Sequence, residues 1–203
     1  PEAYQKPGCP IIVDLNGDGL ITVEDVDMKN VIPSLYWGFG NTFTYKNWDL
    51  DVFIYSQLGV DKYNDVYSWT SGRGLGNQTN NMSVYIKDVW HSELNPNGTI
   101  PGIAYEMASV SLPGGAGTDI GYENSSFVRV RNITLGYNFK PNQLGALSKL
   151  LSGIRVYVDV QNPFTFTGYT GLDPEVNTGG NYKGGKAEYP QTRTFSLGAK
   201  LSF

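Results

Sequence analysis

The segment from Asp14 to Asp25 combines residue types and a spacing that suit a metal ion. When Asp14 is counted as the first position, side-chain oxygens fall at positions one, three and five, a glycine at six and a carboxylate at twelve. A hard cation such as Ca²⁺ prefers a ring of six to eight oxygens in this kind of loop. The expected ligands are Asp14, Asn16, Asp18, the backbone carbonyl of Leu20, and Asp25.

A second interpretation of the same segment needs no ion. Asn, Asp and Gly also gather in loops because their side chains and backbones form Asx turns. If Ca²⁺ does bind, its role is structural, because no second loop of this type pairs with the first and no helix precedes it. The sequence predicts structural Ca²⁺ as the cofactor and leaves the ion-free loop as the alternative.

Catalytic constellations are absent from the sequence. His91 is the single histidine, so a zinc site with several His ligands or a Ser-His-Asp triad has little to build on. Asp49 and Asp51 lie on one face of a predicted strand and could suggest paired glycosidase carboxylates. A position on a strand face that lines the water-filled interior of a β-barrel explains these two carboxylates better. We therefore expect that the chain is not an enzyme.

Composition and charge restrict the partners. Charged residues make up 17% of the chain and the net charge is −4, with Lys and Arg scattered singly, so no basic face is offered to nucleic acid. The single cysteine, Cys9, cannot form a disulfide within the chain. Aromatics at 13% and 25 glycines favour strands with aromatic anchors and Gly-rich turns.

Long strands with a period of two are the elements that must position these residues. In each, bulky apolar side chains alternate with small or polar ones. One stretch changes phase between Val130 and Ile133, which predicts a bulge near Asn132, with a strand that rises out of the apolar layer there as the alternative. Asn47 alone separates the first two strands, which predicts a tight hairpin there. The predicted strands are 36–46, 48–58, 126–139, 154–166 and 193–203.

The strand lengths and the polar residues in mid-strand predict a membrane barrel. Segments of eleven to fifteen residues match the roughly 9–11 that a tilted strand needs to cross hydrocarbon. Asp49, Arg155 and Lys200 sit mid-strand, where a lumen tolerates charge and a packed core does not. The expected fold is an all-β, transmembrane antiparallel β-barrel. Five strands cannot close a barrel, so we expect a piece of a longer one; a soluble β-sandwich with one solvated face is the alternative.

Connections of unequal length divide the chain. We expect an extracellular loop with the Ca²⁺-like site over 1–35, a hairpin over 36–58, a long extracellular loop over 59–125 and the last three strands over 126–203. A helix is predicted around Asn81 to His91, and Leu144 to Leu151 is expected to form one or two helical turns at the periplasmic side.

Several blocks in a fixed order resemble the C-terminal end of SusC/RagA-type TonB-linked outer-membrane transporters. They begin with Asp-Leu-Asn-Gly-Asp-Gly-Leu-Ile-Thr at 14–22 and Tyr-Trp-Gly-Phe-Gly-Asn-Thr-Phe-Thr-Tyr-Lys at 36–46. Further blocks are Phe-Val-Arg-Val-Arg-Asn-Ile-Thr-Leu-Gly-Tyr-Asn-Phe at 127–139, Arg-Val-Tyr-Val-Asp-Val-Gln-Asn-Pro-Phe-Thr-Phe-Thr-Gly-Tyr at 155–169, Gly-Leu-Asp-Pro-Glu-Val at 171–176, and Tyr-Pro-Gln-Thr-Arg-Thr-Phe-Ser-Leu-Gly-Ala-Lys-Leu-Ser-Phe at 189–203. A single block would say little, whereas all of them in this order are specific.

The resemblance implies more than the pattern does. Such transporters have a 22-stranded barrel in the outer membrane of Gram-negative bacteria, an N-terminal plug, a TonB box and a SusD-like surface lipoprotein, and they import oligosaccharides or peptides. The implied partners are therefore the rest of the barrel with its plug, the SusD-like lipoprotein, TonB, and outer-membrane lipid. A secreted, Ca²⁺-binding β-sandwich that binds glycans is the alternative function, and a structural or adhesive surface barrel is a third.

Two further sets of residues are singled out. The aromatics of the long loop could stack on sugars or pack the loop on itself, and packing is the interpretation we favour; they are Tyr67, Trp69, Tyr85 and Trp90. The last strand ends in an aromatic and carries apolar residues at every second position, which resembles the signal read by the barrel-assembly machinery. Its residues are Phe195, Leu197, Leu201 and Phe203.

Overall fold

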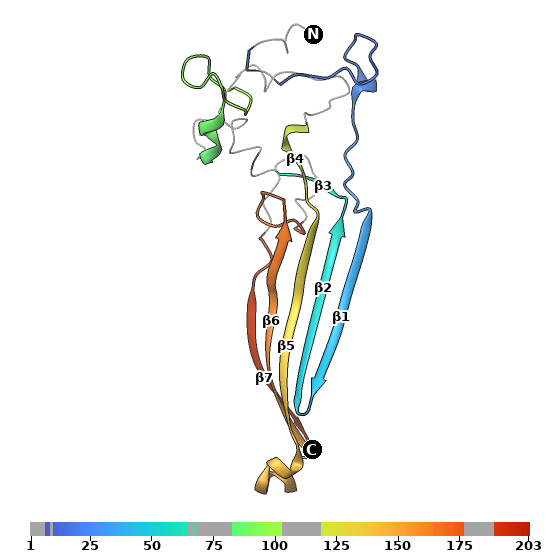
Figure 1. Cartoon of the computed structure of the whole chain (residues 1–203), viewed down its shortest axis with the longest axis vertical. Coiled ribbons are helices and arrows are strands. Elements are labelled where there is room, and N and C mark those ends of the chain that lie inside the picture. The colour runs from blue at the N-terminus through green and yellow to red at the C-terminus, as the bar shows by residue number, and fades with distance from the viewer. Residues whose placement is uncertain (1–6, 9, 65–66, 68–82, 103–118, 177–188) are drawn as a thin grey trace. The chain divides into compact units, whose positions relative to one another are not determined.

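A five-stranded antiparallel sheet is the main element of the computed structural model, which describes residues 7–8, 10–64, 67, 83–102, 119–176 and 189–203. The order of the strands in the sheet is β1-β2-β5-β6-β7 (Figure 1). The strands are β1 (Leu35–Tyr45), β2 (Trp48–Leu58), β5 (Phe127–Phe139), β6 (Gly153–Thr167) and β7 (Thr194–Ser202). The prediction of five long antiparallel strands is confirmed, and the described strands form no closed barrel.

Shorter elements lie in the connections. Strands β3 (Asp61–Tyr63) and β4 (Tyr122–Asn124) pair with each other. Short 3₁₀ helices complete the described part of the chain: η2 (Val23–Asp25), η4 (Val84–Asp88), η7 (Asp119–Gly121), η8 (Pro141–Gln143) and η9 (Gly145–Lys149). Residues 81–82 of the helix expected around Asn81 to His91 lie outside the described residues, and the described remainder contains the short η4. The turns expected at Leu144 to Leu151 are η9. None of the described helices is long and apolar enough to cross a membrane.

The chain divides into two compact units. The sheet unit comprises Asn30–Asp61, Asn124–Val176 and Glu188–Phe203. The loop unit comprises Pro1–Lys29, Lys62–Glu123 and Asn177–Ala187.

The two faces of the sheet differ in character. The register pairs Leu50 with Leu135 and Leu135 with Val158, so the bulky apolar residues of neighbouring strands share one face. Asp49 and Arg155 belong to the other, polar face. The apolar face is open: Leu197 is 77% exposed and Phe195 is 70% exposed. Such an exposed apolar band needs a cover of lipid or protein.

The predicted bulge lies at Arg131. Asn132 pairs with Phe53 and Val130 pairs with Ile54, so Arg131 has no partner residue in β2. This extra residue restores the phase and keeps Val130 and Ile133 on the apolar face. On the β6 side, Asn162 and Pro163 stand opposite the same position. The prediction of a bulge near Asn132 is confirmed.

The hairpin between β1 and β2 has two turn residues, where the sequence predicted one. Tyr45 pairs with Trp48, so Lys46 and Asn47 both form the turn. Lys46 has a φ of 57°, which matches the positive φ that two-residue hairpin turns require. The prediction of a single turn residue was wrong because the alternation pattern alone does not show that Lys46 leaves the ladder.

The two ends of the sheet are built differently. At the turn end lie the Lys46–Asn47 turn, η8, η9 and Phe203, and at the loop end lie the residues around Leu58, Phe127 and Thr167 (Figure 1). The few fully buried side chains of the sheet unit, Phe127, Arg129, Ser56 and Ser125, are at the loop end. There the Ser56 hydroxyl donates to the Phe127 carbonyl at 2.7 Å.

Candidate functional site

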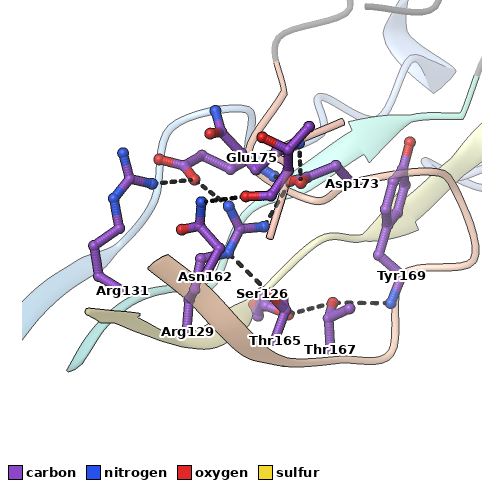
Figure 2. A network of polar contacts seen from close by, with 11 residues as sticks. Ser126, Arg129, Arg131, Asn162, Thr165, Thr167, Tyr169, Asp173 and Glu175 are labelled. Carbon is purple, nitrogen blue, oxygen red and sulfur yellow. Dashed lines mark hydrogen bonds and ion pairs between the residues drawn. The ribbon is translucent and has the colours of Figure 1, made fainter. Parts of the chain in front are cut away.

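The most buried charged group of the sheet unit is the guanidinium of Arg129 on β5. Its Nη2 lies 2.8 Å from Oδ1 of Asp173 and its Nη1 lies 2.6 Å from Oε2 of Glu175. Its Nε donates to the Thr165 hydroxyl at 2.9 Å. Figure 2 shows these side chains converging from β5, β6 and the segment after β6. We call Arg129, Arg131, Thr165, Asp173 and Glu175 the Arg129 cluster.

The two side chains at the centre of the Arg129 cluster are almost wholly buried. The Arg129 side chain is 1% exposed and that of Asp173 is 5% exposed. Arg131, on the bulge, is more exposed and reaches Glu175 at 3.4 Å. A buried charge that loses its partner is strongly unfavourable, so the cluster holds the segment from Asp173 to Glu175 against the polar face of the sheet.

Asp173 also ties together the two ends of the connection between β6 and β7. Its Oδ1 accepts the N–H of Glu175 at 2.8 Å and its Oδ2 accepts the N–H of Gln191 at 3.0 Å. Burial would raise the pKa of Asp173, but these N–H donors and the Arg129 guanidinium hold it below its ordinary value. The carboxyl is therefore a fixed anion that fastens both ends of the connection to β5.

A second ionic contact crosses the polar face near the turn end. Arg155 of β6 pairs with Asp49 of β2, although β5 lies between these strands. Gly136 of β5 leaves the space, because a Cβ at this position would lie 2.6 Å from Asp49 Oδ2 and 2.7 Å from Arg155 Nε. Arg155 also lies over the Tyr157 ring, 5.0 Å from its centroid. The pair therefore fastens three strands laterally.

The predicted metal loop is folded by its own backbone donors. Asp14 accepts the N–H groups of Gly17 and Gly19, each at 2.7 Å, and Gly19 has a φ of 83°. The N–H of Asp18 donates to Asn16 Oδ1 at 2.9 Å. The N–H of Leu20 donates to Asp18 Oδ1 at 2.8 Å. The contacts of Asn16 and Asp18, each with the N–H two residues further on, are the Asx turns of the ion-free interpretation.

Asp25 closes this loop on its first residues. It accepts the N–H of Leu15 at 2.8 Å and that of Thr22 at 2.7 Å. The Thr22 donor foremost, with the Leu15 and Asn16 donors, lowers the pKa of Asp25. Asp25, at position twelve of the loop, thus lies beside positions one to three. A carboxylate oxygen that accepts one N–H keeps a second lone pair, which could bind a metal ion. Within the described residues, however, no three His, Cys, Asp or Glu side chains converge as a metal site.

The aromatic candidates of the loop unit pack against their surroundings where they are described. The rings of Tyr67 and Tyr85 meet edge to face with centroids 5.5 Å apart. A Cβ placed on Gly102 would lie 3.1 Å from the Trp90 indole, so this ring packs directly against the backbone of Gly102. Trp69 lies outside the described residues. These contacts agree with packing, and substrate binding by these residues stays a prediction.

His91 and the residues of the last strand are the remaining candidates from the sequence. Nδ1 of His91 accepts the N–H groups of Glu93 and Leu94, at 3.2 and 3.1 Å, so the imidazole caps a turn. Among the described strands, β7 pairs with β6 alone, and its other edge has no strand partner. The residues of the predicted assembly signal, Phe195, Leu197, Leu201 and Phe203, are all exposed.

The Arg129 cluster was not among the residues predicted from the sequence. Its signal was the Arg-Val-Arg of residues 129–131 together with the Asp-Pro-Glu of residues 173–175, two pairs of opposite charge with the same spacing. That they meet depends on the connection after β6 turning back onto the sheet, which a strand pattern does not reveal.

The chain is similar over almost its whole length to curated TonB-dependent receptors. It is 33% identical to the TonB-dependent receptor SusC of Bacteroides thetaiotaomicron over 208 residues, which is 100% of this chain and 19% of that protein. It is 31% identical to the TonB-dependent receptor P3 of Formosa agariphila over 206 residues, 97% of this chain and 19% of the relative. No family model matches the chain. The chain thus spans about a fifth of the length of these relatives.

Solved structures give the same result for the fold. The RagAB peptide importer in the closed-closed state matches with a TM-score of 0.66 and 25% identity, covering 86% of this chain and 18% of that one. The open-open state of the same importer matches with a TM-score of 0.63 and 27% identity. These matches are to a receptor family and not to enzymes. With its two-faced sheet of long strands, the chain belongs to the SusC/RagA-type TonB-dependent receptors of the outer membrane, as a portion of such a receptor.

Proposed function

We propose that the receptor containing this chain imports oligosaccharides or peptides across the outer membrane by a TonB-dependent mechanism. In this proposal the five-stranded sheet is part of the barrel wall. Its apolar face meets lipid and its polar face lines the interior. The long connections at the loop end face outside, and the turn end faces the periplasm.

The observation that carries the proposal is the division of the sheet into an open apolar face and a charged face. Ionic contacts such as Asp49 with Arg155 lie on one side, and exposed residues such as Leu197 lie on the other. A barrel wall explains both, because lipid covers the apolar band and water solvates the interior. The likeness to the RagAB peptide importer supports transport as the purpose of the wall.

A secreted β-sandwich that binds glycans would need a second sheet on the apolar face. Among the described residues the other sheet is the pair β3 and β4, with three residues in each strand. Strands of that length cannot cover the apolar sides of five strands of nine to fifteen residues. This argument favours the barrel wall over the sandwich.

The partner in our proposal is a SusD-like surface lipoprotein, with TonB acting through other parts of the receptor. The name RagAB of the similar importer denotes a complex, which supports a two-component system. Affinity purification of the tagged full-length receptor from outer membranes tests this: we expect a lipoprotein in stoichiometric amount. Its absence under mild detergent would contradict the partnership.

Growth and uptake test the transport itself. A strain that lacks the full-length receptor should lose growth on one class of nutrient, either oligosaccharides or peptides, as the sole carbon source. A proton ionophore should abolish uptake of the same labelled compound in the parent strain, because TonB-dependent import uses the proton-motive force. Unchanged uptake in the deletion strain, over a panel covering both classes, would contradict the proposal.

We also propose that the loop from Asp14 to Asp25 binds structural Ca²⁺. The support is the chemistry of its donors, which are all oxygen, and the closure of Asp25 on the backbone of Leu15. An ion would take up free lone pairs of Asp14, Asn16, Asp18 and Asp25 and the Leu20 carbonyl. Its effect would be to stiffen an exposed loop and to neutralise carboxylates that stand close together.

A further inference from the structure

The connection between β5 and β6 carries a ridge of leucines at the turn end of the sheet. Leu144 is the N-cap of η9 and Leu150 is its C-cap, with Leu147 between them. Because residues three apart lie on the same face of a 3₁₀ helix, these leucines share one face. Leu147 is 51% exposed and Leu150 is 73% exposed. We call Leu144, Leu147 and Leu150 the leucine ridge.

Hydrogen bonds hold this connection at the turn end of the sheet, beside a group of aromatic side chains. Gln143 Oε1 accepts from Asn47 Nδ2 at 2.7 Å, and its Nε2 donates to the Tyr137 hydroxyl at 3.4 Å. Tyr137 packs edge to face against Trp48 and Phe139. At the other end of the connection, the N–H of Ser152 donates to the Ser202 carbonyl at 2.8 Å. The connection therefore lies at the turn end of the sheet (Figure 1) and contacts Tyr137, which shares a face with Leu135.

The charged side chains of the connection that carries the leucine ridge have one sign. Residues 140–152 contain Lys140 and Lys149 but no Asp or Glu. Lys46 in the neighbouring turn lies over the Tyr45 ring, 5.2 Å from its centroid. The nearest acid of β2, Asp49, is engaged by Arg155. Apolar side chains flanked by lysines match the boundary between acyl chains and anionic headgroups.

We propose that the leucine ridge is a lipid anchor that inserts into the periplasmic leaflet of the membrane, with Lys140 and Lys149 at anionic phospholipid headgroups. The proposal rests on the proposed function, which puts the apolar face in lipid. Continuity with that face and the shared positive charge select phospholipid as the occupant. A surface buried against another part of the receptor would not need a cationic border.

Depth-dependent quenching of a fluorophore in the full-length receptor tests the anchor. The receptor, with its native cysteines including Cys9 replaced by Ser, is labelled with an NBD group at Leu150→Cys and reconstituted in vesicles that contain acyl-chain spin-labelled phospholipid. We expect blue-shifted emission and strong quenching at this position. Ala146→Cys is the matched control, because this exposed residue of η9 lies off the leucine ridge, and its label should stay in water.

A third label separates the anchor from the proposed function. Leu135→Cys lies on the apolar face of β5 and is quenched if the sheet is a membrane wall. Quenching at residue 135 without quenching at residue 150 would overturn the anchor alone. No quenching at either position would overturn the wall. Blue-shifted but unquenched emission at residue 150 would mean that protein covers the leucine ridge, which also overturns the anchor.

Headgroup charge supplies the last readout. Spin-labelled phosphatidylglycerol should quench the label at residue 150 at least about twofold more than spin-labelled phosphatidylcholine at low salt, because lysines near the surface attract anionic lipid. The ratio should approach one in the Lys140→Gln, Lys149→Gln double variant. An equal ratio in both proteins would overturn the role of the lysines.

Discussion

The guanidinium of Arg129 donates to the carboxylate of Asp173 at 2.8 Å, across 44 residues of sequence, and both side chains are almost wholly buried. Arg129 belongs to the wall of the sheet, whereas Asp173 belongs to the connection that leaves β6. This ionic contact therefore fastens the connection, at Asp173, to β5.

Loss of one partner of this pair should destabilise the receptor strongly. For Arg129→Met we expect the free energy of unfolding to fall by about 3–5 kcal/mol, because Asp173 would stay buried without its counter-ion. Urea titration of the full-length receptor in lipid vesicles measures this. Arg131→Met is the control, since Arg131 is 41% exposed and lies 3.4 Å from Glu175. Its loss should cost at most about 1 kcal/mol, and equal effects of the two changes would contradict the account.

The sequence predicted the sheet well because its strands are long and alternate regularly. The bounds of β2 agree with the prediction at both ends, and the others differ by one residue or so. Even the bulge at Arg131 left a signal, because the apolar phase changes between Val130 and Ile133. These features are local, because the polarity of each side chain matches the face of the sheet on which it lies.

The Arg129 cluster could not be predicted in the same way, because it joins segments far apart in sequence. The same holds for Asp49 and Arg155, which meet only because Gly136 of the intervening strand has no side chain. The turn was misjudged because Lys46 is a long polar residue that fits the alternation but adopts a positive φ. Irregular backbone and non-local charge pairs thus set the limit of the prediction.

Filling the space above β5 should break the lateral contact of Asp49 with Arg155. In Gly136→Ala the new Cβ would lie within 2.7 Å of both side chains, and a shift of either weakens the pair. We expect a loss of about 1–3 kcal/mol, as for other overpacked sites. Gly40→Ala on β1 is the control, because its Cβ would meet Phe53 at 3.5 Å, an ordinary contact. If Gly136→Ala is as stable as Gly40→Ala, the contact does not matter for stability.

Calcium should bind the purified receptor through the loop from Asp14 to Asp25. We expect calorimetric titration to detect one ion fewer in the Asp14→Ala, Asp25→Ala double variant than in the unchanged receptor, because the first and last ligands are lost together. Asp27→Ala is the control, since Asp27 is outside the ligand set and pairs with Lys29. Equal stoichiometry in all three proteins would leave the loop as a set of Asx turns without an ion.

Deletion of Phe203 should lower the amount of receptor inserted in the membrane. Strand β7 carries Phe195, Leu197 and Leu201 on the same apolar face, and Phe203 completes the predicted assembly signal. If Phe203 only anchors the mature wall, insertion stays normal and unfolding becomes easier by about 1–3 kcal/mol, the typical value for one large apolar side chain. Heat-modifiable receptor in outer-membrane fractions, quantified beside its unfolding midpoint, separates the two, and unchanged insertion contradicts the signal.

The central claim, that the sheet is a membrane wall with opposite faces in lipid and water, is tested most directly by a cysteine scan along β6 in the full-length receptor. Single cysteines at residues 155–160 are labelled in intact outer-membrane vesicles with a membrane-impermeant maleimide or a lipid-soluble one. The account predicts strict alternation: the lipid-soluble reagent labels Val156, Val158 and Val160, and the aqueous reagent reaches only the side of Arg155, Tyr157 and Asp159. Aqueous labelling of the three valines, or labelling without a period of two, would contradict it.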